Sequence, residues 1–267
     1  MRLIACLSML LPVAAAAQTA PAAEPVRPIT ASKIILVGDS TTAVFGGWGP
    51  SFCAYHVTSF VACVNLARGG RSSGSYRAEG SWDLALAEMR TPGFRKTWVL
   101  IQFGHNDQPG KPGRSTDLAT QFPQNIARYV DEVRAAKAIP VLVTPLTRRM
   151  FDNGRLNNDL EPWAAAIRKV AAEKQVALLD LNAESAAAVQ AMGEASADRF
   201  AQLPRGAAPT VQSPAPAATE IQEMPMARPH LAFDRTHLGT EGANYFATMV
   251  TRELGAAVPE LRPSLVP

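Results

Sequence analysis

The sequence predicts a three-layer α/β sandwich with a five-stranded parallel sheet in the middle. Short apolar runs rich in β-branched residues alternate along the chain with longer segments of helical periodicity. These apolar runs are nearly continuous, as expected for strands that are buried on both faces. Because strands that alternate with helices pair in parallel through right-handed crossovers, we expect helices on both sides of the sheet.

Each element of this prediction occupies a definite part of the chain. The five expected strands are residues 33–40, 60–67, 97–104, 139–146 and 176–181. The five expected helices are residues 50–59, 81–89, 118–137, 160–174 and 240–254. In the fourth helix, Trp163, Ile167 and Val170 recur at helical spacing. In open sheets of this kind the chemistry sits at the carboxyl ends of the strands.

The two ends of the chain and one internal segment lack this alternation. Residues 1–20 have one arginine, an apolar run and then small residues, which predicts a signal peptide. Residues 21–32 are rich in Ala and Pro and read as a flexible leader to one domain, residues 33–257. Residues 192–229 are expected to be an Ala/Pro-rich surface insertion, and residues 258–267 a C-terminal tail.

Composition limits the expected partners and compartment. The chain has 267 residues, of which 47% are hydrophobic and 18% charged, and a net charge of +3. No basic block suits nucleic acid, and no segment reaches the roughly 20 apolar residues that a spanning helix needs. We therefore expect a monomer without membrane or nucleic-acid partners, and the signal peptide predicts that it is secreted or periplasmic. Cys53 and Cys63 either pair in an oxidising compartment or are small buried residues.

A serine and a histidine suggest nucleophilic catalysis. Ser40 follows the first strand and Gly38, and a tight turn there presents its hydroxyl at the sheet edge. Asp234 precedes His237 by three residues, so its carboxylate can bind one ring nitrogen and leave the other free as a base. The alternative for these residues is a helix cap and a surface histidine.

Two further loops offer hydrogen-bond donors. Gly70 lies in a glycine pair after the second strand, where its backbone amide can approach a ligand closely. Asn106 follows the third strand and offers uncharged amide donors. With the Ser40 amide, these groups are expected to form an oxyanion hole. Ordinary turns are the alternative, and a metal site is disfavoured because no ligand spacing such as HExxH occurs.

In this order, Ser40, Gly70, Asn106 and His237 resemble the four sequence blocks of the SGNH hydrolases, also called GDSL esterases. Thr41 stands where the GDSL motif has Leu. The GGRSS, EGSWD, GHND and HLGTEGA segments are similar to those of rhamnogalacturonan acetylesterases, which remove O-acetyl groups from pectin. This resemblance implies a flavodoxin-like fold, no cofactor, and a shallow open site for an acetylated polysaccharide. The insertion before Asp234 departs from the family pattern.

Substrate contacts are predicted at Arg71, Arg77 and Trp82. Arginines can pair with galacturonate carboxylates, and a tryptophan can stack on a sugar face. Alternatively, the arginines brace loops and Trp82 belongs to the core. The expected function is an exported acetylesterase acting on rhamnogalacturonan. An SGNH esterase for acetylated xylan, lipid or small acyl esters and a non-catalytic carbohydrate-binding protein are the alternatives.

Overall fold

The computed structural model describes residues 30–208, 210–211, 230–231 and 233–267. The expected signal peptide, most of the leader and a large part of the expected insertion lie outside the described residues. No described helix is long and apolar enough to cross a membrane.

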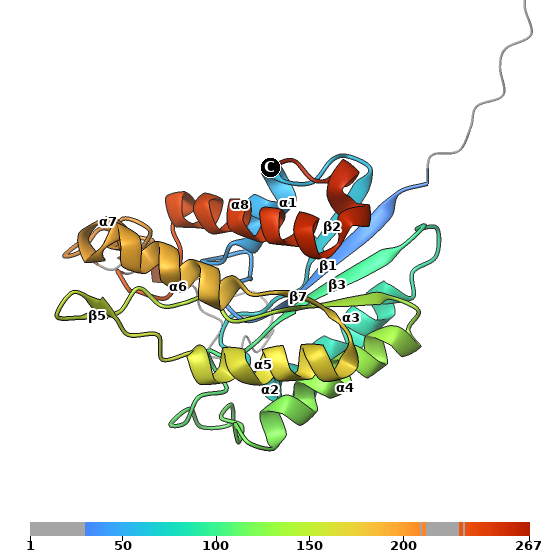
Figure 1. The fold of residues 1–267 in the computed structure, drawn as a ribbon, viewed down its shortest axis with the longest axis horizontal. Helices are drawn as coiled ribbons and strands as arrows, with labels where there is room; N and C mark the ends of the chain where they lie inside the picture. Colours follow the sequence, from blue (N-terminus) through green and yellow to red (C-terminus); the bar gives the residue numbers. More distant parts are fainter. Residues whose placement is uncertain (1–29, 209, 212–229, 232) are drawn as a thin grey trace, which may run out of the picture.

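A five-stranded parallel sheet lies at the centre of the fold, as predicted (Figure 1). Its strands in spatial order are β2 (Val61–Asn65), β1 (Ser32–Gly38), β3 (Thr97–Gln102), β4 (Ile139–Val143) and β7 (Ala177–Leu179). All four pairings are parallel, and the order is that of flavodoxin-like sheets. The order reverses between β1 and β3, so the crevice beyond these two strands is the expected ligand site.

Two apolar cores cover the two faces of the sheet. In β1, Ile34 and Leu36 point into one core, while Ile35 and Val37 point into the other. This alternation explains why the strand sequence is continuously apolar. One face is covered by α1 (Gly49–Tyr55), α6 (Leu181–Met192) and α8 (Thr240–Ala257), and the other by α3 (Ser81–Met89), α4 (Gln121–Ala135) and α5 (Glu161–Lys174) (Figure 1).

Several short elements were not predicted. The chain turns directly from β7 into α6, an Ala-rich helix. A hairpin joins β5 (Phe151–Asp152) to β6 (Arg155–Leu156) through Asn153 and Gly154, both at positive φ, which is the usual chemistry of a two-residue turn. The remaining short elements are α2 (Ser75–Ala78), β8 (Thr210–Val211) and β9 (His230–Leu231).

Two segments expected to be irregular are partly ordered. The predicted surface insertion, residues 192–229, includes α7 (Glu194–Asp198), in which Ala197 is buried, so the prediction of a surface insertion was wrong for this part. The predicted tail contains a 3₁₀ helix, Pro259–Ser264, whose Leu261 is 1% exposed. Apolar contacts with α8 hold this helix against the domain.

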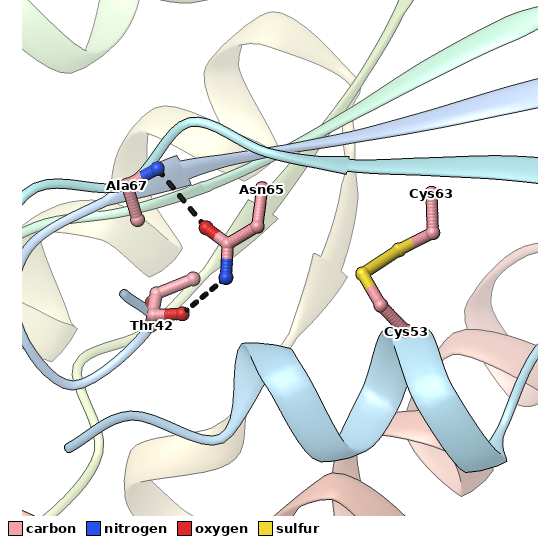
Figure 2. The surroundings of a disulfide bond; sticks show 5 residues. All are labelled: Thr42, Cys53, Cys63, Asn65 and Ala67. Atoms are coloured by element: carbon pink, nitrogen blue, oxygen red, sulfur yellow. Dashed lines mark hydrogen bonds between the residues drawn. A yellow bond between two sulfur atoms is a disulfide. The ribbon is translucent and has the colours of Figure 1, made fainter. Parts of the chain in front are cut away.

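A disulfide joins Cys53 in α1 to Cys63 in β2 (Figure 2). Farther along β2, Asn65 donates from Nδ2 to the Thr42 carbonyl at 2.9 Å and accepts from the Ala67 amide at 3.1 Å. The disulfide therefore fastens α1 to β2, and the bond from Asn65 to Thr42 fastens the end of β2 to the loop that follows β1.

We predict that replacing both cysteines, Cys53→Ala and Cys63→Ala, will lower the free energy of unfolding. The two cysteines are 10 positions apart. Closing a loop of this length in the unfolded chain is worth about 3 kcal/mol. Urea denaturation of the oxidised protein and the double variant measures the difference, and equal midpoints with equal slopes would contradict the prediction.

Candidate active site

The turn after β1 places Ser40 at the carboxyl edge of the sheet. The buried Asp39 side chain accepts hydrogen bonds from Thr41, from its amide at 2.9 Å and from its hydroxyl at 2.8 Å. A Cβ at Gly38 would lie 2.7 Å from the Gln102 carbonyl oxygen, so only glycine fits between β1 and β3. The result is a tight, internally bonded turn that leaves Ser40 partly exposed.

The threonine that replaces Leu of the GDSL motif belongs to a buried polar chain. Gln102 Nε2 donates to Thr41 Oγ1 at 2.6 Å, and Trp48 Nε1 donates to Gln102 Oε1 at 2.9 Å. These bonds link the turn after β1 to the end of β3 and to the start of α1. A leucine at position 41 would leave the Gln102 amide without this acceptor, which is costly in a buried site.

Ser40, His237 and Asp234 form a continuous chain of hydrogen bonds. Ser40 Oγ and His237 Nε2 are 3.0 Å apart, and His237 Nδ1 and Asp234 Oδ2 are 2.7 Å apart. The carboxylate fixes the imidazole orientation and leaves Nε2 to accept the serine proton. The structure therefore brings together all three predicted residues in an arrangement suited to acyl transfer.

Asp234 is held as an anion. Its Oδ1 accepts from the backbone amides of Thr236 and His237, at 2.7 and 2.6 Å. Partial burial by itself would raise the pKa of Asp234, but the bonds from His237 and the two amides outweigh it and lower the pKa to about 2. The carboxylate can thus stabilise an imidazolium at any pH at which the serine chemistry operates.

The predicted oxyanion donors lie on loops that are bonded to one another. The Arg68 amide donates to the Gly38 carbonyl at 2.9 Å, so the loop after β2 runs beside the nucleophile turn. Asn106 Nδ2 donates to the Arg71 carbonyl at 3.1 Å. Within the described part of the chain, the Ser40 and Gly70 amides have no hydrogen-bond acceptor. They are therefore free to bind a developing oxyanion.

Asp107 fastens the loop after β3 to the loop after β2. Its carboxylate accepts from the Ser73 hydroxyl at 2.6 Å, from the Ser73 amide and from the Thr116 hydroxyl. Burial raises the pKa of Asp107 to about 6, even though these hydrogen bonds act in the opposite direction. Its carboxylate is therefore engaged in holding the two loops together.

Arg149, which was not predicted, holds the loop that carries the histidine. It is fully buried and donates from Nη2 to the carbonyls of Asp234 and His237, at 3.0 and 2.8 Å. Its own amide donates to the Arg235 carbonyl at 2.8 Å. Burial lowers the pKa of Arg149 to about 10, so it remains a cation at neutral pH. The only sequence signal was a charged pair, Arg148 and Arg149, just past a buried strand.

Helix α7 holds the same loop from outside. Arg235 forms ion pairs with Glu194 and Asp198, the latter at 3.1 Å. On the inner side, the Leu238 amide donates to the Gly46 carbonyl at 2.8 Å. The part of the predicted insertion that forms α7 therefore serves to position the histidine loop.

The predicted substrate contacts need correction. Trp82 is 2% exposed and donates from Nε1 to Glu132, so it belongs to the core beneath α3 and α4. Arg77 is paired with the same Glu132 at 2.8 Å and stacks on Tyr129. These two positions are wrong as substrate contacts, because burial and an internal carboxylate partner occupy them.

Arg71 lies close to the site but is also engaged internally. Its Nε donates to Glu79 at 2.8 Å and its Nη1 to the Gly69 carbonyl at 2.7 Å, and the residue is 5% exposed. Its side chain braces the oxyanion loop instead of offering a free cation.

The described residues contain no cluster of three or more His, Cys, Asp or Glu side chains arranged for a metal. His105 is buried with Nδ1 3.3 Å from Asp39 Oδ2, and His237 is bound to Ser40 and Asp234. The side chain of His230 lies outside the described part.

A surface groove of about 370 Å³ opens beside the histidine loop. Its wall includes Gly46 and Leu238, together with the exposed aromatic rings of Phe45 and Tyr55. The groove runs between the loop after β1 and α1 on one side and the start of α8 on the other, and it reaches the histidine loop at Leu238.

Comparison with known proteins identifies the family. Residues 36–211 match the GDSL-like lipase/acylhydrolase family. This chain belongs to that family. It is therefore a carboxylic ester hydrolase.

This esterase is similar to two curated relatives and, in its fold, to a solved structure. The chain is 30% identical over 240 residues to the probable rhamnogalacturonan acetylesterase YesY of Bacillus subtilis, covering 86% of this chain and 97% of the relative. It is 37% identical over 176 residues to rhamnogalacturonan acetylesterase RhgT of the same organism, covering 63% and 72%. The fold is similar to that of Axe2, an acetylxylan esterase from Geobacillus stearothermophilus, with a TM-score of 0.55, 16% identity and coverage of 85% and 96%.

We predict that Arg149→Met will slow this esterase without changing its affinity for a small ester. Removing the guanidinium releases the carbonyls of Asp234 and His237, and a small displacement of the base costs on the order of 10²-fold in turnover. The kcat and KM for an aryl acetate measure the effect, with Arg155→Met as the control because Arg155 is exposed on β6. Full turnover in a variant with native circular dichroism would contradict the positioning role.

Proposed function

We propose that this enzyme is an exported acetylesterase that removes O-acetyl groups from rhamnogalacturonan. The observation that carries the chemistry is the hydrogen-bonded chain from Ser40 through His237 to Asp234. The similarity to two rhamnogalacturonan acetylesterases supports the substrate. The exposed groove beside the histidine loop suits a polymer, because sugar rings can lie along its aromatic wall.

The reaction we propose proceeds in two acyl-transfer steps. His237 Nε2 accepts the Ser40 proton while Ser40 Oγ attacks the acetyl carbonyl carbon. The amides of Ser40 and Gly70 and the side-chain amide of Asn106 stabilise the resulting oxyanion. When the C–O bond to the sugar breaks, His237 gives the proton to the departing sugar oxygen, which leaves as a hydroxyl, and an acetyl-serine remains. Water then attacks this ester by the same route and releases acetate.

Two features support export. Residues 1–20 have the pattern of a signal peptide, and the Cys53–Cys63 disulfide suits an oxidising compartment. Acetylated plant polymers are also too large to enter a cell intact, which agrees with action outside the cytoplasm.

We expect the mature enzyme to release acetate from acetylated rhamnogalacturonan and much less from acetylated xylan. Acetate is measured by an enzymatic assay on both polymers in parallel. Ser40→Ala is the control, and it should abolish release because the nucleophile is gone. Release from xylan alone would overturn the pectin assignment while keeping the serine chemistry.

The pH dependence of turnover tests the assigned base. The pKa of Asp234 is about 2, so this carboxyl stays ionised as the pH falls from neutral, and a histidine acts as a general base only in its neutral form. We expect kcat to fall on the acid side in a single step of one proton. Initial rates with an aryl acetate from pH 4 to pH 9 measure it. A rate that stays constant into acid would exclude His237 as the base.

A further inference from the structure

Two cations lie on the loop that presents Asn106. Arg114 Nη1 is 3.4 Å from Asn106 Oδ1 and 3.5 Å from the Gly70 carbonyl, so its guanidinium borders the proposed oxyanion hole. Lys111 Nζ donates to the His105 carbonyl at 2.6 Å. The Arg114 amide donates to the Lys111 carbonyl, which places both residues on one turn. Both are half-buried, so their positions are set by the loop.

These cations differ from the other arginines around the site. Arg71, Arg77 and Arg148 each form an ion pair with a carboxylate of the same chain. Among the described residues, Lys111 and Arg114 form none. Within the described part of the chain, these two positive charges therefore lie at the edge of the site without a carboxylate in ion-pair contact.

The surroundings of Lys111 disfavour the charged form of its side chain. Partial burial and the nearby charges of Arg148 and Arg114 lower the pKa of Lys111, although Asp39 and Asp159 act in the opposite direction. A bound anion would offset the repulsion between Lys111 and the two arginines. Its hydrogen bonds would also replace part of the hydration that burial removes from the Lys111 ammonium. Such a site is expected where a substrate brings its own negative charge.

We propose that Lys111 and Arg114 form a subsite for the carboxylate of a uronic acid residue in the polysaccharide, next to the sugar that carries the ester. This inference rests on the proposed function, and it assigns to these residues the role that the sequence suggested for Arg71 and Arg77. The Arg114 guanidinium, whose Nη1 lies near Asn106 Oδ1 and the Gly70 carbonyl, supplies one positive charge for a carboxylate, and Lys111 adds a second as a point charge. Because Arg114 also contacts Asn106, a uronate bound here would lie beside the reacting ester.

The test uses non-acetylated trigalacturonate as an inhibitor of aryl acetate hydrolysis. The aryl ester is neutral and small, so its turnover does not require the subsite. For the wild-type enzyme we expect competitive inhibition by trigalacturonate, none by xylotriose, and little by inorganic phosphate at the same ionic strength. Lys111→Gln keeps a donor toward the His105 carbonyl but removes the charge, and should raise the inhibition constant about tenfold.

Matched variants separate charge from loop structure. Lys111→Arg should retain most of the inhibition, because the charge remains. Lys169→Gln is the control, since Lys169 is a surface lysine of α5 with a side chain that is 76% exposed. Lys169→Gln should hydrolyse the aryl acetate at the wild-type rate. For the two Lys111 variants, kcat for the aryl acetate is measured together with the inhibition constant, and the inhibition constant is the quantity that tests the subsite. Arg114→Lys is not used as a control, because Arg114 contacts Asn106 and its loss should also lower kcat.

Three results would overturn the subsite. These are an unchanged inhibition constant in Lys111→Gln, equal inhibition by xylotriose, and equal inhibition by phosphate, which would indicate a general anion effect. The failure of the subsite can be distinguished from the failure of the proposed function. Acetate release from acetylated rhamnogalacturonan without a Lys111 effect would keep the function and reject the subsite. A Lys111 effect without acetate release from that polymer would keep the subsite and reject the polymer.

Discussion

The hydrogen bond between Ser40 Oγ and His237 Nε2 joins two side chains that are 197 positions apart in the sequence. One belongs to a tight turn at the end of the first strand, and the other to a loop that precedes the last helix. The strand is fixed by the sheet, so the position of the base depends on what holds its loop. Arg149 binds the carbonyls of that loop from within, and α7 binds Arg235 from outside. The precision of the serine–histidine contact therefore comes from an internal arginine and a peripheral helix.

The other half of the site depends on contacts between neighbouring strand ends. Parallel strands bring the loops after β1, β2 and β3 to one edge, and buried polar side chains then bond these loops together. Donors that are fixed before the substrate arrives need no reorganisation when the oxyanion develops. The same rigidity holds Lys111 and Arg114 next to Asn106, where a charged substrate can be oriented with respect to the ester.

The sequence was sufficient to predict the sheet and the grouping of Ser40, Asp234 and His237 in one site, because both follow from local patterns. These patterns are continuous apolar strands, a serine after a glycine turn, and an aspartate three residues before a histidine. It was insufficient wherever a role depends on a distant partner. Arg77 looked like a free cation because its carboxylate, on Glu132, lies 55 positions away. Arg149 gave little signal because its acceptors are backbone carbonyls, which every residue has. Helix α6 was missed because it begins two residues after β7, without a loop to mark the change.

The most direct measurement of the central claim is covalent labelling with a serine-directed fluorophosphonate, followed by mass spectrometry of the modified peptide. The account predicts one adduct, on Ser40, that forms rapidly in the wild-type enzyme, slowly in His237→Ala and not at all in Ser40→Ala. Labelling at another serine, or labelling of Ser40 at the same rate without His237, would contradict the assignment of this serine and histidine as the nucleophile and its base.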